Sequence, residues 1–224
     1  MNELIFLFHV IGIVSSLLIA MRWGKSALIS LTALFAVVAN IFVMKQITLF
    51  SLHVTASDAL AVGSVLGIGL LQEYFGDKTA KKAISISFGL MFFFGMLSQI
   101  HLLYTPSGFD QTQSSFQMIL GSTPRIIAAS FFAFYVMQKC NVWVLHLLKK
   151  RLPKLHLSFR MALSGSVAQV IDTVLFGFLG LYGIVHSITH ILLMSLCIKL
   201  ISILISLPFT SFSKRFMKEA HEQV

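Results

Sequence analysis

Long apolar runs separated by short polar breaks organise this chain. Each run is long enough for an α-helix to cross a hydrocarbon core of about 30 Å. The runs are continuous and do not alternate apolar and polar positions as the strands of a membrane barrel would. The pattern predicts an all-α integral membrane protein of about seven transmembrane helices, at residues 4–21, 26–44, 57–75, 83–103, 125–148, 159–181 and 186–207.

The polar breaks are too short to hold a soluble domain, so residues 1–224 are expected to form a single transmembrane domain. The longest connection, 104–124, contains no lysine or arginine, and we expect a short interfacial or re-entrant helix at 114–120. The N-terminal run carries Glu3 and lacks both a basic segment and a small-residue cleavage site. It is therefore interpreted as a retained helix rather than a signal peptide.

Composition agrees with this class. The 224 residues are 57% hydrophobic and 11% charged, whereas soluble domains carry about 25% charged residues. The formal net charge is +9, but no basic stripe alternates with exposed aromatic residues on a soluble face. The excess charge is therefore interpreted as a topology signal, and no nucleic-acid partner is expected.

Lysine and arginine are divided very unevenly between the two sets of connections. Thirteen lie in the first, third and fifth connections, at the start of the sixth helix or in the C-terminal tail, and only Lys45 lies on the other side. By the positive-inside rule, the N-terminus is expected outside and the C-terminus in the cytoplasm. We expect a multi-pass protein of the cell inner membrane.

The sequence offers no convincing catalytic or metal-binding motif. Walker, GxSxG and HExxH motifs are absent. His186 and His190 share one helix face without a carboxylate between them, which is more typical of an interfacial pair than of a metal site. Cys140 and Cys197 lie inside predicted helices and are interpreted as small buried hydrophobic residues. We therefore expect a protein that is not an enzyme and that has no cofactor and no metal.

Six charged residues remain within the predicted helices. Asp58 begins the third helix, where a helix cap is as good an interpretation as a ligand, and Glu73 lies at its cytoplasmic end. Asp172 and Lys199 each lie about thirteen residues inside a helix, where an unpaired charge costs several kcal/mol. The remaining two are Arg125 and Lys139.

Two interpretations of Asp172 and Lys199 compete. The two residues either form a buried pair that joins two helices, or they line a polar cavity. Neighbouring polar residues favour the cavity: Gln169 shares the helix face of Asp172, and Asn40, Gln99, Arg125, Ser130 and Gln138 add hydrogen-bonding capacity on other helices.

The residues also suggest a flat polar ligand. A carboxylate can accept hydrogen bonds from the two adjacent donors of a guanine-like edge, whereas adenine presents a different edge. Phenylalanines that offer stacking surface are Phe88, Phe92, Phe93, Phe94, Phe131, Phe132, Phe134 and Phe176.

Four segments carry a resemblance to a known family: "LLQEYFGDKTAKKAI", "PRIIAASFFAFYVMQKCNVWV", "SGSVAQVIDTVLF" and "CIKLISILISLP". Together they resemble the YhhQ family of queuosine-precursor transporters, also called the vitamin uptake transporter (VUT) family. The resemblance implies a six-helix core, to which the first helix here is an addition. It also implies import of a 7-deazaguanine base (preQ0, preQ1 or queuine) for the tRNA modification queuosine.

The positions that match the family are Arg125, Gln138, Asp172, Lys199 and the turn 73–76. Asp172, with Gln169 beside it, is expected to accept the donor edge of the base, and Lys199 to balance that charge or contact the base carbonyl. Arg125 is expected at the outer entrance and Gln138 at a lower wall.

Asn40 adds an amide on the outer side, and Glu73 is a candidate gate or proton site. Departures from the family are Gln169, where many members have Asn, Gly69 or its neighbours, where many have an acidic residue, and Asn141, where some have Asp. These departures leave the predicted fold unchanged but leave open which deazaguanine the protein prefers.

Several alternatives stay open at this point. One is an importer of another nucleobase or vitamin, including a substrate-binding subunit that needs an ATPase partner. Others are a membrane enzyme or sensor, and a purely structural helix pair. Homo-oligomerisation and the energy source are also open.

Overall fold

The structure is a computed structural model that describes residues 1–43, 45–49, 52–121, 124–182 and 188–221. Eight α-helices and one two-stranded hairpin make up these residues, together with a π-helical turn, Gly177–Leu181, that ends α7. The elements are α1 (Asn2–Arg22), α2 (Lys25–Phe42), β1 (Gln46–Leu49), β2 (Leu52–Thr55), α3 (Asp58–Phe75), α4 (Asp77–Leu102), α5 (Gln113–Leu120), α6 (Pro124–Arg151), α7 (Leu157–Phe176) and α8 (Ile188–His221).

A short two-stranded hairpin, which the sequence did not predict, accompanies the helices. β1 and β2 pair antiparallel, with Ile47 opposite Val54 and Leu49 opposite Leu52. The hairpin is rich in β-branched residues that favour strands, and Leu49 and Val54 bury their side chains in the core. The short helix expected at 114–120 is present as α5, Gln113–Leu120. The start predicted for the last helix, at His186, lies outside the described residues.

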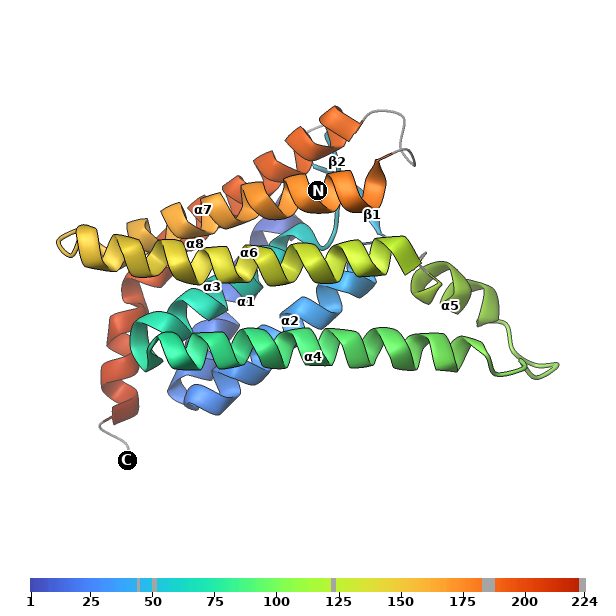
Figure 1. Ribbon diagram of the computed structural model, residues 1–224, viewed down its shortest axis with the longest axis horizontal. Coiled ribbons are helices and arrows are strands. Elements are labelled where there is room, and N and C mark those ends of the chain that lie inside the picture. The colour runs from blue at the N-terminus through green and yellow to red at the C-terminus, as the bar shows by residue number, and fades with distance from the viewer. Residues whose placement is uncertain (44, 50–51, 122–123, 183–187, 222–224) are drawn as a thin grey trace.

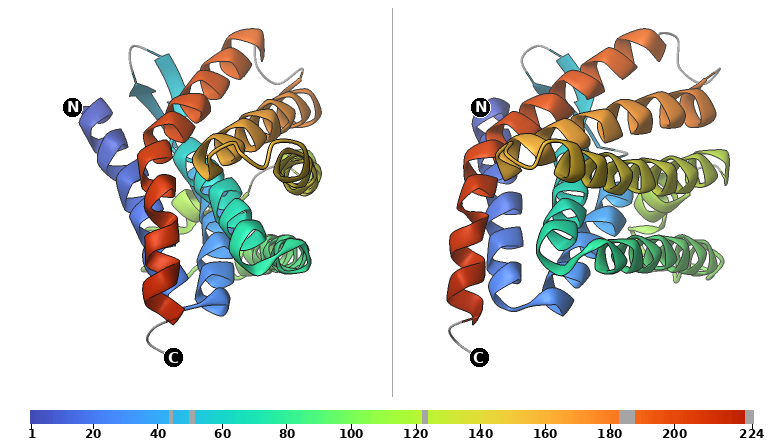
Figure 2. Two further views of the ribbon diagram at one scale, coloured as in Figure 1. Left: turned by 90° about the vertical axis from the view of Figure 1, so that its left-hand side faces the viewer. Right: turned by 60° about the vertical axis from the view of Figure 1, so that its left-hand side comes forward.

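Two helices extend beyond their predicted bounds into polar sequence. α4 begins at Asp77, directly after Gly76, whose φ of +84° favours glycine and allows the chain to reverse between α3 and α4. α8 continues to His221 with Pro208 inside it, and Figure 2 shows this helix changing direction along its length. Thr210 and Ser211 donate to the carbonyl of Leu207 beside the proline, and hydroxyl bonds of this kind to the helix backbone often accompany a bend.

Helix α3 lies at the centre of the molecule and is almost completely enclosed. Fourteen of its eighteen residues are buried. It contacts α1, α2, α4, α6, α7 and α8. Gly67 permits the close approach to α2, because a Cβ there would collide with the side chain of Thr32. This central position holds both ends of α3, and the carboxylates near them, at fixed places between the other helices.

Six described helices are long and apolar enough to cross a membrane: Asn2–Arg22, Lys25–Phe42, Asp77–Leu102, Ala128–Arg151, Leu157–Gly180 and Leu192–Ser213. They lie in α1, α2, α4, α6, α7 and α8. Helix α3 is the remaining long helix of the predicted seven. It is not among these six, and it carries polar residues near both ends, with Asp58 at its start and Gln72 and Glu73 near its end. The protein is thus a mainly helical membrane protein, and a seventh span by α3 stays a prediction.

The connections gather at two opposite ends of the molecule. The α1–α2, α3–α4 and α6–α7 connections lie toward the end that also holds the C-terminus, and the hairpin, α5 and the α4–α5 loop lie toward the other (Figure 1). The N-terminus is at the hairpin end, where Asn2 Nδ2 donates to the Thr48 carbonyl at 3.0 Å. The basic connections therefore share one end, and the charge pattern predicts that this end faces the cytoplasm.

Candidate functional site

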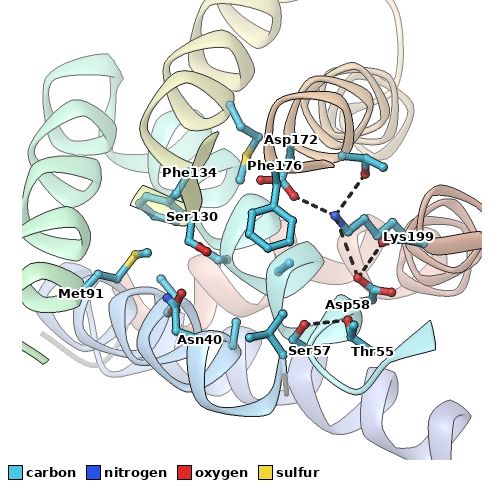
Figure 3. Close-up of a pocket in the computed structure, with 18 of the residues that line it drawn as sticks. Asn40, Thr55, Ser57, Asp58, Met91, Ser130, Phe134, Asp172, Phe176 and Lys199 are labelled. Atoms are coloured by element: carbon cyan, nitrogen blue, oxygen red, sulfur yellow. Dashed lines mark hydrogen bonds and ion pairs between the residues drawn. The ribbon is translucent and has the colours of Figure 1, made fainter. Parts of the chain in front are cut away.

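A cavity of about 130 Å³ lies between the helices, close to the hairpin end. This is several times the ~10–15 Å³ that one water molecule needs on the same measure. The ends of α2 and α7, the start of α3 and the first half of α8 supply most of its wall, with α4 and α6 on the opposite side (Figure 3). Residues that line it include Asn40, Asp58, Ser64, Met91, Ser130, Phe134, Asp172, Phe176, Ser195 and Lys199.

Three charged residues, Asp58, Asp172 and Lys199, form what we call the charge triad. Lys199 Nζ lies 2.7 Å from Asp172 Oδ2 and 4.0 Å from Asp58 Oδ1. It also donates to Thr173 Oγ1 at 3.2 Å, and Ser195 Oγ donates to Asp58 Oδ1 at 3.0 Å. Lys199 is 6% exposed and Asp58 3%. Lys199 therefore neutralises one carboxylate directly and lies next to a second.

Helix periodicity explains how the sequence assembles this triad. Ser195 and Lys199 are four residues apart and share one face of α8. Helices α7 and α8 contact each other, so this face meets the stretch of α7 that carries Asp172 and Thr173. The first residue of α3 then brings Asp58 to the same place, because α8 also contacts α3.

Asn40 is the third predicted site residue at the cavity, after Asp172 and Lys199. Its Nδ2 donates to the Ala36 carbonyl of its own helix at 3.0 Å. A smaller adjoining cavity, about 40 Å³, shares Asn40, Met91 and Ser130 with the first and extends toward Leu120 of α5. The two cavities together connect the charge triad with the helix that follows the long α4–α5 loop.

The two predicted glutamines are buried beside the cavity and do not line it. Gln138 is 0% exposed, and its Nε2 donates to Ser64 Oγ at 3.0 Å while Oε1 has no partner within the described residues. Gln169 is also 0% exposed, and neither its Nε2 nor its Oε1 is hydrogen-bonded in the described part of the chain. Unpaired buried amides are costly and call for an explanation.

Arg125 and Glu73 lie away from the charge triad. The exposed Arg125 donates through Nε to the Leu179 carbonyl at 2.8 Å and through Nη2 to the Tyr182 carbonyl at 2.9 Å. These bonds join the start of α6 to the end of α7, and Arg125 is not among the residues that line the cavity.

Glu73 lies fifteen residues after Asp58 in α3, which corresponds to about 22 Å along the helix. It pairs with Arg160 and Lys149, each at 3.3 Å. It is therefore part of an ion-pair cluster toward the opposite end of α3, where it joins α3 to α6 and α7.

Asp58 is the residue whose place sequence reasoning left undecided. The interpretation as a helix cap is not what the structure shows, because the N-cap position is Ser57, without a side-chain cap bond, and the Asp58 carboxylate points to Ser195 and Lys199. A signal was present in the sequence: the acidic side chain begins a helix that is otherwise strongly apolar.

Of the eight phenylalanines considered for stacking, Phe134 and Phe176 line the main cavity.

Comparison with known proteins gives a family match and a relative of similar length. The family model described as "Putative vitamin uptake transporter" matches residues 55–213, from the end of β2 to the last third of α8. A protein of Bacillus subtilis (strain 168) named "Probable queuosine precursor transporter" is 29% identical over 220 residues, which cover 96% of each chain. That alignment includes the region of α1 and α2, so the N-terminal helices are not an addition relative to this protein. No solved structure matches the chain.

The family match spans more than half of the chain and contains all three residues of the charge triad. The six apolar helices fit a multi-pass membrane protein. The chain belongs to the vitamin uptake transporter family of membrane proteins.

Proposed function

We propose that the protein imports a queuosine precursor, a 7-deazaguanine base such as preQ0, preQ1 or queuine, across the inner membrane. The observation that carries this proposal is the Asp172 carboxylate at the wall of an otherwise largely apolar cavity. Lys199 bonds to its Oδ2 at 2.7 Å, and within the described residues no hydrogen bond involves its Oδ1. The name of the Bacillus relative supports the same substrate class.

The proposed binding mode follows from the chemistry of the cavity. Asp172 accepts hydrogen bonds from the donor edge of the base, and Lys199 keeps the carboxylate neutralised while the site is empty. Phe134 and Phe176 line the same cavity and offer aromatic faces for a flat ring. A site built in this way rejects bases that lack the donors, because its own polar groups would be left unpaired.

The direction of transport rests on the predicted orientation. With the N-terminus outside, the cavity lies in the outer half of the protein, and the smaller cavity under α5 extends it toward the outer loop. Arg125 shapes this entrance indirectly, through its bonds to the end of α7. The cluster around Glu73 closes the cytoplasmic half, because it joins three helices.

Uptake of labelled preQ0, preQ1 and queuine tests the proposal in cells that can neither make nor import these bases. Wild type is compared with Asp172→Asn at equal amounts in the membrane. Asp77→Asn is the matched control, because Asp77 pairs with His146 at the opposite end of α3. We expect base-selective uptake by wild type and Asp77→Asn, and its loss in Asp172→Asn. Absence of uptake by correctly inserted wild type would contradict the proposal for the protein acting alone.

The family description favours one alternative, the import of a vitamin. The wider form of this alternative is an importer of another nucleobase or a vitamin in which this chain is the substrate-binding subunit of an ATPase-driven complex. Purified protein in liposomes separates the two. Base uptake without ATP or a second protein supports a self-sufficient transporter. Base binding without uptake in liposomes supports the complex. The oligomeric state is measured in the same preparation, since a homo-oligomer is compatible with either function.

A further inference from the structure

The charge triad holds one unused hydrogen-bond donor. A lysine ammonium has three N–H donors. Lys199 uses one for Asp172 Oδ2 at 2.7 Å and one for Thr173 Oγ1 at 3.2 Å. Asp58 Oδ1, at 4.0 Å, is too far for a hydrogen bond. Within the described residues, the third donor of Lys199 therefore stays unpaired at the wall of the cavity.

The same triad holds two unused acceptors. Asp172 Oδ1 takes part in no hydrogen bond within the described residues, whereas Oδ2 is bound to Lys199. Asp58 accepts from Ser195 through Oδ1, and its Oδ2 is buried without a partner in the described part of the chain. The nearby hydroxyl of Thr55 pairs with that of Ser57 at 2.9 Å (Figure 3). An unpaired carboxylate oxygen that is buried this deeply indicates a ligand group that completes it.

One donor and two acceptors are complementary to the hydrogen-bonding edge of a guanine-type base. That edge presents a carbonyl acceptor, a ring N–H donor and an exocyclic amino donor, in this order. We propose that the charge triad reads the whole edge: Lys199 donates to the carbonyl, Asp172 accepts from the ring N–H, and Asp58 accepts from the exocyclic 2-amino group. Asp58 is thereby the residue that selects for bases with a 2-amino group.

The three groups of the triad lie close together. Lys199 Nζ is 2.7 Å from Asp172 Oδ2 and 4.0 Å from Asp58 Oδ1, so one small ligand can contact all three side chains. The three side chains surround one side of the cavity and leave the opposite side to Asn40, Met91 and Phe134 (Figure 3).

This inference rests on the proposed function, since it assigns the specificity of the same site. The loss of a hydrogen bond to a charged acceptor corresponds to about a ten- to hundredfold change in affinity. A base without the 2-amino group should therefore bind at least about tenfold more weakly. A change at Asp58 should remove this difference and leave the affinity for the base without the amino group nearly unchanged.

Binding of preQ0 and of its analogue without the 2-amino group tests the inference, with purified protein in lipid nanodiscs. We expect wild type to prefer preQ0 at least about tenfold. In Asp58→Leu, which keeps a similar volume, the preference should fall to less than about threefold. Asp172→Asn should weaken both ligands to a similar extent, because both retain the ring N–H. Asp77→Asn changes a carboxylate that pairs with His146 at the opposite end of α3, away from the cavity, and should keep the preference.

Each outcome has a definite meaning. Equal binding of both ligands by wild type, or a full preference retained in Asp58→Leu, overturns the role of Asp58 and leaves the proposed function standing. If neither ligand binds to folded wild type, the proposed function fails together with this inference. If Asp58→Leu does not fold, Asp58→Ala is measured instead: its side chain has no acceptor, and retention of the full preference in that variant also overturns the inference.

Discussion

The net charge of the buried triad predicts how its variants rank in stability. Two carboxylates and one ammonium carry a net charge of −1 when all are ionised. Lys199→Met leaves both carboxylates without a cation. Asp58→Asn instead leaves the Lys199–Asp172 pair, with its 2.7 Å contact, fully balanced. We therefore expect Lys199→Met to be the most destabilising of these changes and Asp58→Asn the least.

The magnitudes follow from burial. Removing one partner from a buried ion pair costs about 3–5 kcal/mol, and Lys199, which is 6% exposed, falls in this class. Asp58→Asn gives up an attraction across 4.0 Å but also removes the uncompensated negative charge from a buried site, so its net effect should be close to zero. For a chain of this size, the gap between the two variants corresponds to about 6–20 °C in melting temperature.

Thermal unfolding in one detergent at a fixed scan rate measures this ranking. The double variant Lys199→Met with Asp58→Asn retains one unbalanced carboxylate, and its melting temperature should fall between those of the two single variants. If Lys199→Met melts within about 3 °C of wild type, water solvates the charges well, and the assumption that the triad is shielded from water is wrong.

Three further variants test the packing and the two ends of the molecule. Gly67→Ala should cost about 1–3 kcal/mol of stability, because its Cβ would collide with Thr32, whereas Gly89→Ala, where a Cβ meets nothing within 4 Å, should melt at or above the wild-type temperature; the reverse order would contradict the close approach of α2 and α3. Glu73→Gln should lower the melting temperature, since it breaks two ion pairs at 3.3 Å, but should leave the affinity for the base unchanged, and a large loss of affinity would instead support a direct role in transport. Arg125→Lys cannot make both backbone contacts, so hydrogen exchange at residues 177–182 should become faster, and unchanged exchange would show that these two bonds do not hold the end of α7.

Continuous apolar runs predicted most of the helices, because the hydrocarbon core of the bilayer requires runs of this length. A run of apolar residues must be helical to satisfy its backbone in the bilayer, so α1, α2, α6 and α7 lie close to their predicted ranges. The hairpin was missed because its strands have only four residues each, which is too short for an alternating pattern to stand out. The polar extensions of α4 and α8 were missed because their charged residues are typical of loops but also compatible with exposed helix.

The sequence predicted residues of the cavity mainly where a charged side chain lies deep within an apolar helix. Asp172 and Lys199 were recognisable because no helix end is within reach of either side chain. Asp58 was ambiguous for the opposite reason: its position at a helix start has an ordinary explanation, and only the contact between α3 and α8 decides against it. Periodicity within one helix cannot supply such contacts between helices. For the same reason, Arg125 and Glu73 were grouped with the cavity although they bind partners elsewhere.

Gln169 provides a test of whether function or stability explains a buried polar group. It is 0% exposed, and neither amide atom has a partner within the described residues. If the amide is retained for transport, Gln169→Met, which has a similar volume, should raise stability by about 1–3 kcal/mol and lower base uptake. If a buried water instead satisfies the amide in the resting protein, the same change should lower stability. Melting temperature and uptake, measured on the same variant, therefore separate the two: a stabilised but inactive variant assigns Gln169 to the transport cycle, and a destabilised variant makes it a structural residue beside the cavity.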